Sequence, residues 1–211
     1  MNHDEIVSLV GKIRFAATRY ECDLIPEEPV IKRPCRGSDL MRLREHFGEA
    51  LPIAVQEFFT TATAHLEFSW HLIGDFPEPF SGITCGGLTL SPDSIVAADL
   101  GRASWAKEVY PNAEDSYDKL WQSCYGLVDL ECGDFLAWDK LGRIVYLSHD
   151  GMTDWHGYVV AKSFKEFIRN YLFLGAPEPE FGWEIFTEDS ESGISSSSEV
   201  ARLWIELFFL E

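Results

Sequence analysis

The spacing of apolar and polar residues predicts a chain that begins with helices, continues with strands and ends with helices. In residues 4–20, Ile6, Leu9, Val10 and Ile13 recur near helical spacing, which predicts an amphipathic helix. Residues 25–39 contain three prolines and one glycine, which predicts a loop. A short helix over 40–48 follows, and Ser38 or Asp39 could cap its first turn.

A longer helix should begin near Leu51, with Pro52 at the first helical position, where the missing N–H of proline costs nothing. After this helix the spacing of apolar residues changes from the helical period to an alternating one. Residues 66–73 alternate apolar and polar side chains, and residues 83–90 predict a second strand. Residues 125–149 hold short apolar blocks separated by turn signals, which predicts an antiparallel meander.

Helices are also expected between and after these strands. Ser91 as N-cap with Pro92 behind it predicts one or two short helices, and residues 113–123 should begin as a loop. Ser163 should cap a helix that ends at Gly175. A last helix has an apolar stripe that should pack on the rest of the domain, formed by Val200, Leu203, Trp204, Leu207 and Phe208.

This order predicts an α+β fold with strands clustered in the middle and a C-terminal helix. The 211 residues, 46% of them hydrophobic, suit one domain with a packed core. We expect residues 1–38 to form an N-terminal helix and loop extension, residues 39–175 the core, and residues 176–211 an acidic, serine-rich loop and the final helix.

Charge and cysteine content narrow the function classes. The net charge of −18 argues against nucleic acid or anionic lipid as partner, since both require Lys and Arg against phosphate. It suits a soluble acidic protein, or one whose surface attracts a basic partner. The five cysteines form no C-x-x-C pair, which favours free thiols in a reducing cytosol. No signal peptide or membrane span is recognisable, so a cytoplasmic location is expected.

The candidate for chemistry is the segment RIVYLSHDGMTDWHG, residues 143–157. It brings together His149, Asp150, Asp154 and His156, a set that can bind a divalent metal in a hydrolase. The alternative is structural: Asp150-Gly151 is a strong turn signal, and the histidines then lie at strand ends. Signatures of nucleotide-binding loops, zinc proteases, serine hydrolases and deaminases are absent.

Several motifs in order resemble the SUKH superfamily, which contains fungal cell-wall regulators of the Smi/Knr type and bacterial toxin-immunity proteins. The resemblance covers roughly residues 40–175, and one departure is Ala64-His65 where the family often has Asn-Gly. The matching positions are Leu51, Pro52, Phe58, Trp70, Gly133, Asp134, Leu136, Ala137, Asp139, Ser148, His149, Asp150, Ser163, Phe164, Phe167, Leu174 and Gly175.

The resemblance implies a mixed, mostly antiparallel sheet with helices on one face, and a binding module with no cofactor and no turnover. Its motif residues are then structural, with Trp70 a core side chain that also donates a hydrogen bond and Asp134 a bonding partner for turn amides. Candidate partner contacts are exposed carboxylates and one aromatic anchor, namely Glu114, Asp115, Asp118, Asp129, Glu131, Asp150, Asp154 and Trp155.

The leading hypothesis is an immunity protein that binds and neutralises a basic toxin domain, often a nuclease, through its acidic surface. The alternatives are the metal-dependent hydrolase at residues 149–156 and a regulatory scaffold module like the fungal members. The sequence leaves the oligomeric state and the identity of the partner open.

Overall fold

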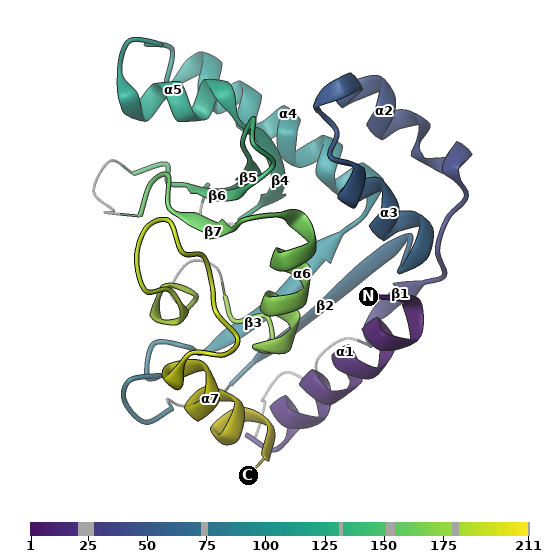
Figure 1. The fold of residues 1–211 in the computed structure, drawn as a ribbon, viewed down its shortest axis with the longest axis vertical. Coiled ribbons are helices and arrows are strands. Elements are labelled where there is room, and N and C mark those ends of the chain that lie inside the picture. Colours follow the sequence, from purple (N-terminus) through teal and green to yellow (C-terminus); the bar gives the residue numbers. More distant parts are fainter. Residues whose placement is uncertain (21–27, 73–75, 131–132, 151–154, 179–181, 211) are drawn as a thin grey trace.

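The computed structural model describes residues 1–20, 28–72, 76–130, 133–150, 155–178 and 182–210 (Figure 1). In this part of the chain the predicted α+β class is confirmed. Its α-helices are α1 His3–Thr18, α2 Met41–Phe47, α3 Ile53–Thr61, α4 Pro92–Glu108, α5 Ser116–Ser123, α6 Phe164–Phe173 and α7 Glu199–Ile205.

The strands belong to two antiparallel sheets, where the family resemblance implies a mixed sheet. The first sheet has the order β1-β2-β3, and the second is the meander β4-β5-β6-β7. Their bounds are β1 Val30–Lys32, β2 His65–His71, β3 Cys85–Leu90, β4 Tyr125–Asp129, β5 Phe135–Trp138, β6 Ile144–Leu147 and β7 Val159–Ala161.

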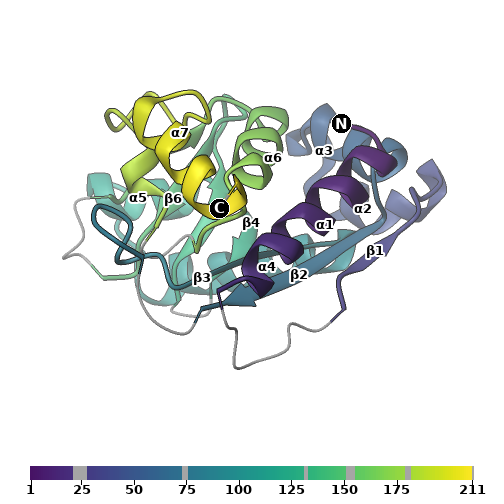
Figure 2. The same cartoon turned by 90° about the horizontal axis from the view of Figure 1, so that it is seen from below.

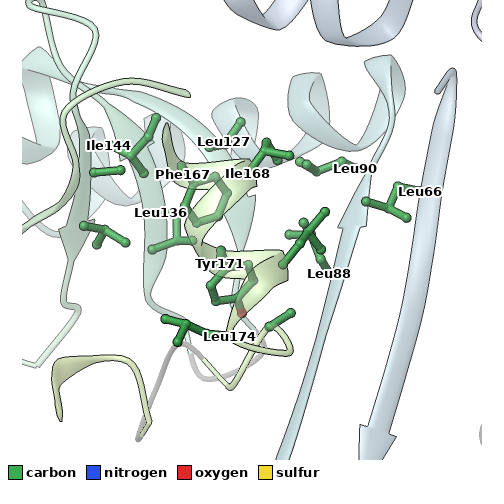
Figure 3. Packing of buried hydrophobic residues seen from close by; sticks show 14 of the residues in the cluster. Leu66, Leu88, Leu90, Leu127, Leu136, Ile144, Phe167, Ile168, Tyr171 and Leu174 are labelled. Atoms are coloured by element: carbon green, nitrogen blue, oxygen red, sulfur yellow. The ribbon is translucent and has the colours of Figure 1, made fainter. Parts of the chain in front are cut away.

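Helix α6 lies between the two sheets and joins them into one core. Figure 3 shows Phe167, Ile168 and Tyr171 of α6 directed between the leucines of β2 and β3 and the apolar residues of β4, β5 and β6. The helix begins where expected, because the Ser163 hydroxyl accepts a hydrogen bond from the Glu166 N–H at 3.2 Å. The same buried cluster continues from α1 to Phe208 near the C-terminus.

The N-terminal segment, which the family resemblance does not cover, contributes to this core. Ile6, Val10 and Ile13 of α1 are buried in the main cluster. Figure 2 shows α1 on the same side of the three-stranded sheet as α6. The C-terminal helix packs on the domain through Trp204 and Phe208, which are fully buried, whereas Leu203 of the predicted apolar stripe is 51% exposed.

The chain after α6 covers one outer edge of each sheet. At β3, the Gly87 N–H donates to Ala176 O at 2.8 Å. At β7, the Val159 N–H donates to Ser190 O and the Ile194 N–H donates to Val160 O, both at 2.8 Å. Backbone groups that would otherwise offer a template for another strand are therefore bonded within the chain.

Several elements differ from the sequence prediction. Strand β1 lies within the segment predicted as a loop, and α4 is one helix of 17 residues where one or two short helices were predicted. Ser38 and Asp39 do not cap α2, because they lie in a 3₁₀ turn at Gly37–Leu40 and Leu40 precedes the helix. Further 3₁₀ turns lie at Gly48–Ala50 and Glu184–Phe186, and α7 continues as a π-helical turn at Glu206–Leu210.

None of the helices in the described ranges is long and apolar enough to cross a membrane.

Candidate functional site

The candidate site lies at one end of the four-stranded sheet. The meander pairs Phe135 of β5 with Asp129 of β4 on one side and with Leu147 of β6 on the other. The residues that follow β6, His149 and Asp150, therefore lie near the start of β5. Segments that are distant in sequence converge here because antiparallel strands end and begin at the same sheet edge.

Asp134 is the buried centre of this end. Its carboxylate accepts a hydrogen bond from the His149 backbone N–H at 2.6 Å and from His149 Nδ1 at 2.7 Å. The second carboxylate oxygen accepts a hydrogen bond from the Tyr146 hydroxyl. Only 4% of Asp134 is exposed, so these three donors replace the water that an isolated carboxylate would need. The resulting bonds connect the start of β5 with the end of β6.

Three aromatic side chains, two from α5 and one from the loop between α4 and α5, bind the backbone just after β6. The Tyr117 hydroxyl and the Trp121 indole N–H both donate to Ser148 O, the latter at 3.2 Å. The Tyr110 hydroxyl donates to His149 O. Burial raises the pKa of Tyr110, and raises that of Tyr117 to about 12, so both phenols keep their protons at neutral pH.

His156 uses both ring nitrogens within the protein. Nδ1 accepts a hydrogen bond from the Ser148 N–H, and Nε2 donates to Tyr117 O, both at 3.1 Å. This pattern requires the neutral ring with its proton on Nε2. Burial lowers the pKa of His156, which favours the same neutral form. The ring also stacks on Tyr117, with 3.7 Å between the centroids.

These contacts bear directly on the metal hypothesis. His156 bonds to backbone groups through both ring nitrogens, so its ring cannot ligate a metal without losing one of these hydrogen bonds. His149 bonds to Asp134 through Nδ1 alone, so this bond leaves its Nε2 uninvolved. Asp154 lies outside the described residues. Among the described residues, no group of three or more His, Cys, Asp or Glu side chains is placed to hold a metal ion. The bonding of the histidines agrees with the structural interpretation of this segment.

Four of the predicted contact residues belong to the segments that carry these aromatic rings or the backbone they bind, and we call them the acidic rim: Glu114, Asp115 and Asp118 lie just before or at the start of α5, and Asp150 follows β6. Asp115 is the N-cap of α5, and its side chain accepts a hydrogen bond from the Tyr117 N–H at 2.8 Å. Burial is the largest cause of the raised pKa of Tyr110, and the negative charges of nearby carboxylates, among them Asp118 and Asp150, raise it further. Both of these residues therefore lie near its ring. Figure 1 shows α5 and β6 on the same side of the molecule.

The other candidate contacts are placed differently. Asp129 is exposed at the end of β4, at the same end of the sheet. Glu131 lies outside the described residues. Trp155 is half-buried, and its ring packs edge-on to the fully buried ring of Trp183 at 6.4 Å between centroids. Trp155 therefore offers a partner only part of its surface.

The family-motif residues lie mainly in the core or in turns. Trp70 is buried and its indole N–H donates to Gly175 O at 2.7 Å, as the sequence predicted. Asp139 holds the β5–β6 turn by accepting from the backbone N–H groups of Leu141 and Arg143. Besides Trp70, the apolar motif side chains with at most 7% exposure are Leu51, Phe58, Leu136, Ala137, Phe164, Phe167 and Leu174.

A buried polar network beneath the site was not predicted. Asp99 of α4 accepts from Arg102 Nε at 2.9 Å, from the Gly126 N–H at 2.8 Å and from His46 Nε2 at 2.8 Å. Arg102 also donates to Trp121 O. The sequence did contain a signal for this network: at helical spacing, Asp99 and Arg102 fall on the same buried face of α4 as its apolar residues.

No family model matches this chain, and no curated protein or solved structure matches it either.

Proposed function

We propose that this chain is a non-catalytic, protein-binding immunity module that neutralises a basic toxin domain in the cytosol. The proposal combines the motif resemblance with one structural observation: the acidic rim stands on a base whose polar groups are bonded within the protein. Asp134, His149 and His156, which could otherwise act on a substrate, hold the backbone that carries the rim.

Electrostatics supports a basic partner. Residues 105–160 hold ten carboxylates against four lysine or arginine residues. A toxin that cleaves nucleic acid needs a basic groove for phosphates. An acidic inhibitor is steered to such a groove and excludes the substrate by occupying it. The rigid base adds to this, because carboxylates on an already ordered surface lose less conformational freedom on binding.

The direct test is protection from the toxin-like product of a reading frame adjacent to this gene. Cells that express both proteins should survive, and a triple variant Glu114→Gln, Asp118→Asn, Asp150→Asn should protect poorly. A matched control neutralises three exposed carboxylates elsewhere, Glu45→Gln, Glu49→Gln and Glu188→Gln. Both variants change the net charge by the same amount, so a difference in protection between them reports a contact between the toxin and the rim. Equal protection by both variants, or death despite the wild-type protein, would refute the proposal.

A further inference from the structure

A second surface, distant from the acidic rim, has the form of a binding groove. It has a volume of about 970 Å³ and lies between α1, α3 and α6. Figure 2 shows α1 and α6 as neighbouring helices above the three-stranded sheet, with α3 behind them. Figure 1 places α1 and α5 at opposite corners of the molecule, so this groove does not belong to the rim.

The two long walls of the groove run parallel. The beginnings of α1 and α6 both meet α3, through His3 Nδ1 at 2.8 Å from Ala62 O and through the rings of Phe58 and Phe164 at 5.5 Å. The far ends of both helices approach Phe208: the guanidinium of Arg19, just past α1, donates to its carbonyl at 2.9 Å. The groove is therefore closed at the α3 end and flanked by helix N-termini there.

The lining is apolar along its length and charged at its edges. Half-buried Leu9 and Ala54 lie between Met1, 36% exposed, and Phe173, 48% exposed. Such exposed apolar surface inside a concave site is typical of interaction sites.

The charges at the edges are unevenly distributed along the groove. The closed end holds three carboxylates, Asp4, Glu5 and Glu57, and one lysine, Lys165 at the start of α6. Lys12 and Arg169 lie further along α1 and α6. Glu5 lies 3.8 Å from the Met1 amino group, whereas within the described part of the chain the other five form no ion pair. The groove therefore has a surplus of carboxylates at its closed end and two unpaired cations toward the other end.

These features select one kind of occupant. All lining residues except the terminal Met1 and Asn2 belong to helices, so the groove has no strand edge to pair with an extended peptide, whose backbone groups would lose water without gaining partners. A helix satisfies its own backbone. The α1 wall from residue 1 to 12 is roughly 17 Å long at 1.5 Å per residue, which fits about three helical turns.

We infer that this groove binds an amphipathic helix of a partner protein, antiparallel to α1 and α6. The apolar face of that helix packs on Leu9, Ala54 and Phe173. Its first turn carries carboxylates toward Lys12 and Arg169, and its last turn carries cations toward Asp4 and Glu57. Carboxylates in the first turn and cations in the last turn also stabilise the dipole of the bound helix. Because the bound helix is antiparallel to α1 and α6, its dipole is antiparallel to theirs, which is favourable.

The test uses two synthetic helical peptides of about 16 residues with the same composition and the same apolar stripe. The forward peptide has Glu in its first turn and Lys in its last turn, and the swapped peptide has the reverse. Fluorescence anisotropy at low salt should show the forward peptide binding about tenfold more tightly. Lys12→Glu with Arg169→Glu should remove or reverse this preference. The control Lys107→Glu with Lys119→Glu, on α4 and α5, should leave it intact.

A second variant reports on the apolar contact. Phe173→Ser should weaken forward-peptide binding several-fold, whereas Leu141→Ser, which changes a residue 78% exposed in the β5–β6 turn, should not. The inference is overturned if neither peptide binds, if both bind equally, or if control and groove variants behave alike. It is also overturned if sedimentation shows a dimer that Phe173→Ser dissociates, because a second copy of this chain would then occupy the groove.

Discussion

At the scale of single residues, the candidate site is defined by where each hydrogen bond goes. The sequence brought His149, Asp150 and His156 to attention because they lie close together along the chain. It could not show that His149 faces Asp134, or that Tyr110 and Tyr117 donate to the backbone after β6, since these partners are 15 to 39 residues away. Only the arrangement of α4, α5 and the sheet decides whether these groups are available for chemistry.

Removal of the Asp134 carboxylate should destabilise the protein strongly. Asp134→Ala leaves the Tyr146 hydroxyl and two donors of His149 without their acceptor, and we expect a loss of about 3 kcal/mol in the free energy of unfolding. Tyr146→Phe removes one donor only and should cost about half as much. Urea denaturation measures both. If Asp134→Ala unfolds at the same urea concentration as the exposed control Glu45→Ala, the assigned role of Asp134 is wrong.

The neutral state of His156 predicts a pH dependence with a definite sign. Its pKa in the folded state lies below its ordinary value of 6.5, so as the pH falls the unfolded chain takes up this proton first. The stability contributed by His156 is complete above about pH 6.5 and is lost as the pH falls toward the folded-state pKa. Protonation also removes the Nδ1 lone pair that accepts from Ser148.

His156→Gln should therefore flatten the pH profile of stability between about pH 7.5 and pH 5, since glutamine does not titrate. His71→Gln, at an exposed position on β2, serves as the control and should keep the wild-type slope. Thermal unfolding in a series of buffers gives both slopes. Parallel profiles for wild type and His156→Gln would contradict the buried, neutral assignment.

At the scale of elements, local signals predicted the helices well but missed the edge strand β1. Ser91 caps α4, and its side chain accepts from the Ser94 N–H at 3.0 Å, because a cap depends only on neighbouring residues. Strand β1 has only three residues, between Pro29 and Pro34, and becomes a strand through pairing with β2. The same prolines and the exposed Lys32 disfavour pairing of this edge with another strand. The prolines that made the segment look like a loop in the sequence therefore also protect the sheet edge.

The junction of α6 with the C-terminal helix offers a test of packing. Gly175 has a φ of 84°, and a Cβ there would lie 2.8 Å from the ring of Phe208. Gly142 has a φ of 79° with open space around it, so Gly142→Ala measures backbone strain alone, about 1 kcal/mol. Gly175→Ala should lose at least about 2 kcal/mol, because the strain and the clash add. If chemical denaturation shows that both variants lose the same free energy of unfolding, the ring of Phe208 moves aside at no energetic cost and the predicted clash is wrong.

At the scale of the whole molecule, the sequence was enough to predict the α+β fold class and to count the net charge, but not to predict how the two sheets are arranged. The α+β order follows from the change of hydrophobic period along the chain, whereas the division into two sheets depends on where α6 inserts between them. The rim and the α1–α3–α6 groove lie at opposite ends, and they differ in character: one is acidic on a rigid base, the other apolar with separated charges.

This separation predicts independent binding. Contacts at sites without shared partners contribute nearly additively. Saturation of the groove with the forward peptide should therefore leave the affinity for the basic toxin domain unchanged, as isothermal titration would show. A change of more than about threefold in either direction would instead mean that the two surfaces are coupled.

The central claim, that the acidic rim captures a basic toxin domain, is tested most directly by the salt dependence of the association rate. Stopped-flow mixing with the toxin-like product of the adjacent reading frame should give a rate that falls steeply as ionic strength rises. The triple variant at Glu114, Asp118 and Asp150 should associate more slowly with a shallower slope, and the charge-matched control at Glu45, Glu49 and Glu188 should stay close to wild type. A rate that does not depend on salt, or equal slopes for the two variants, would contradict the account.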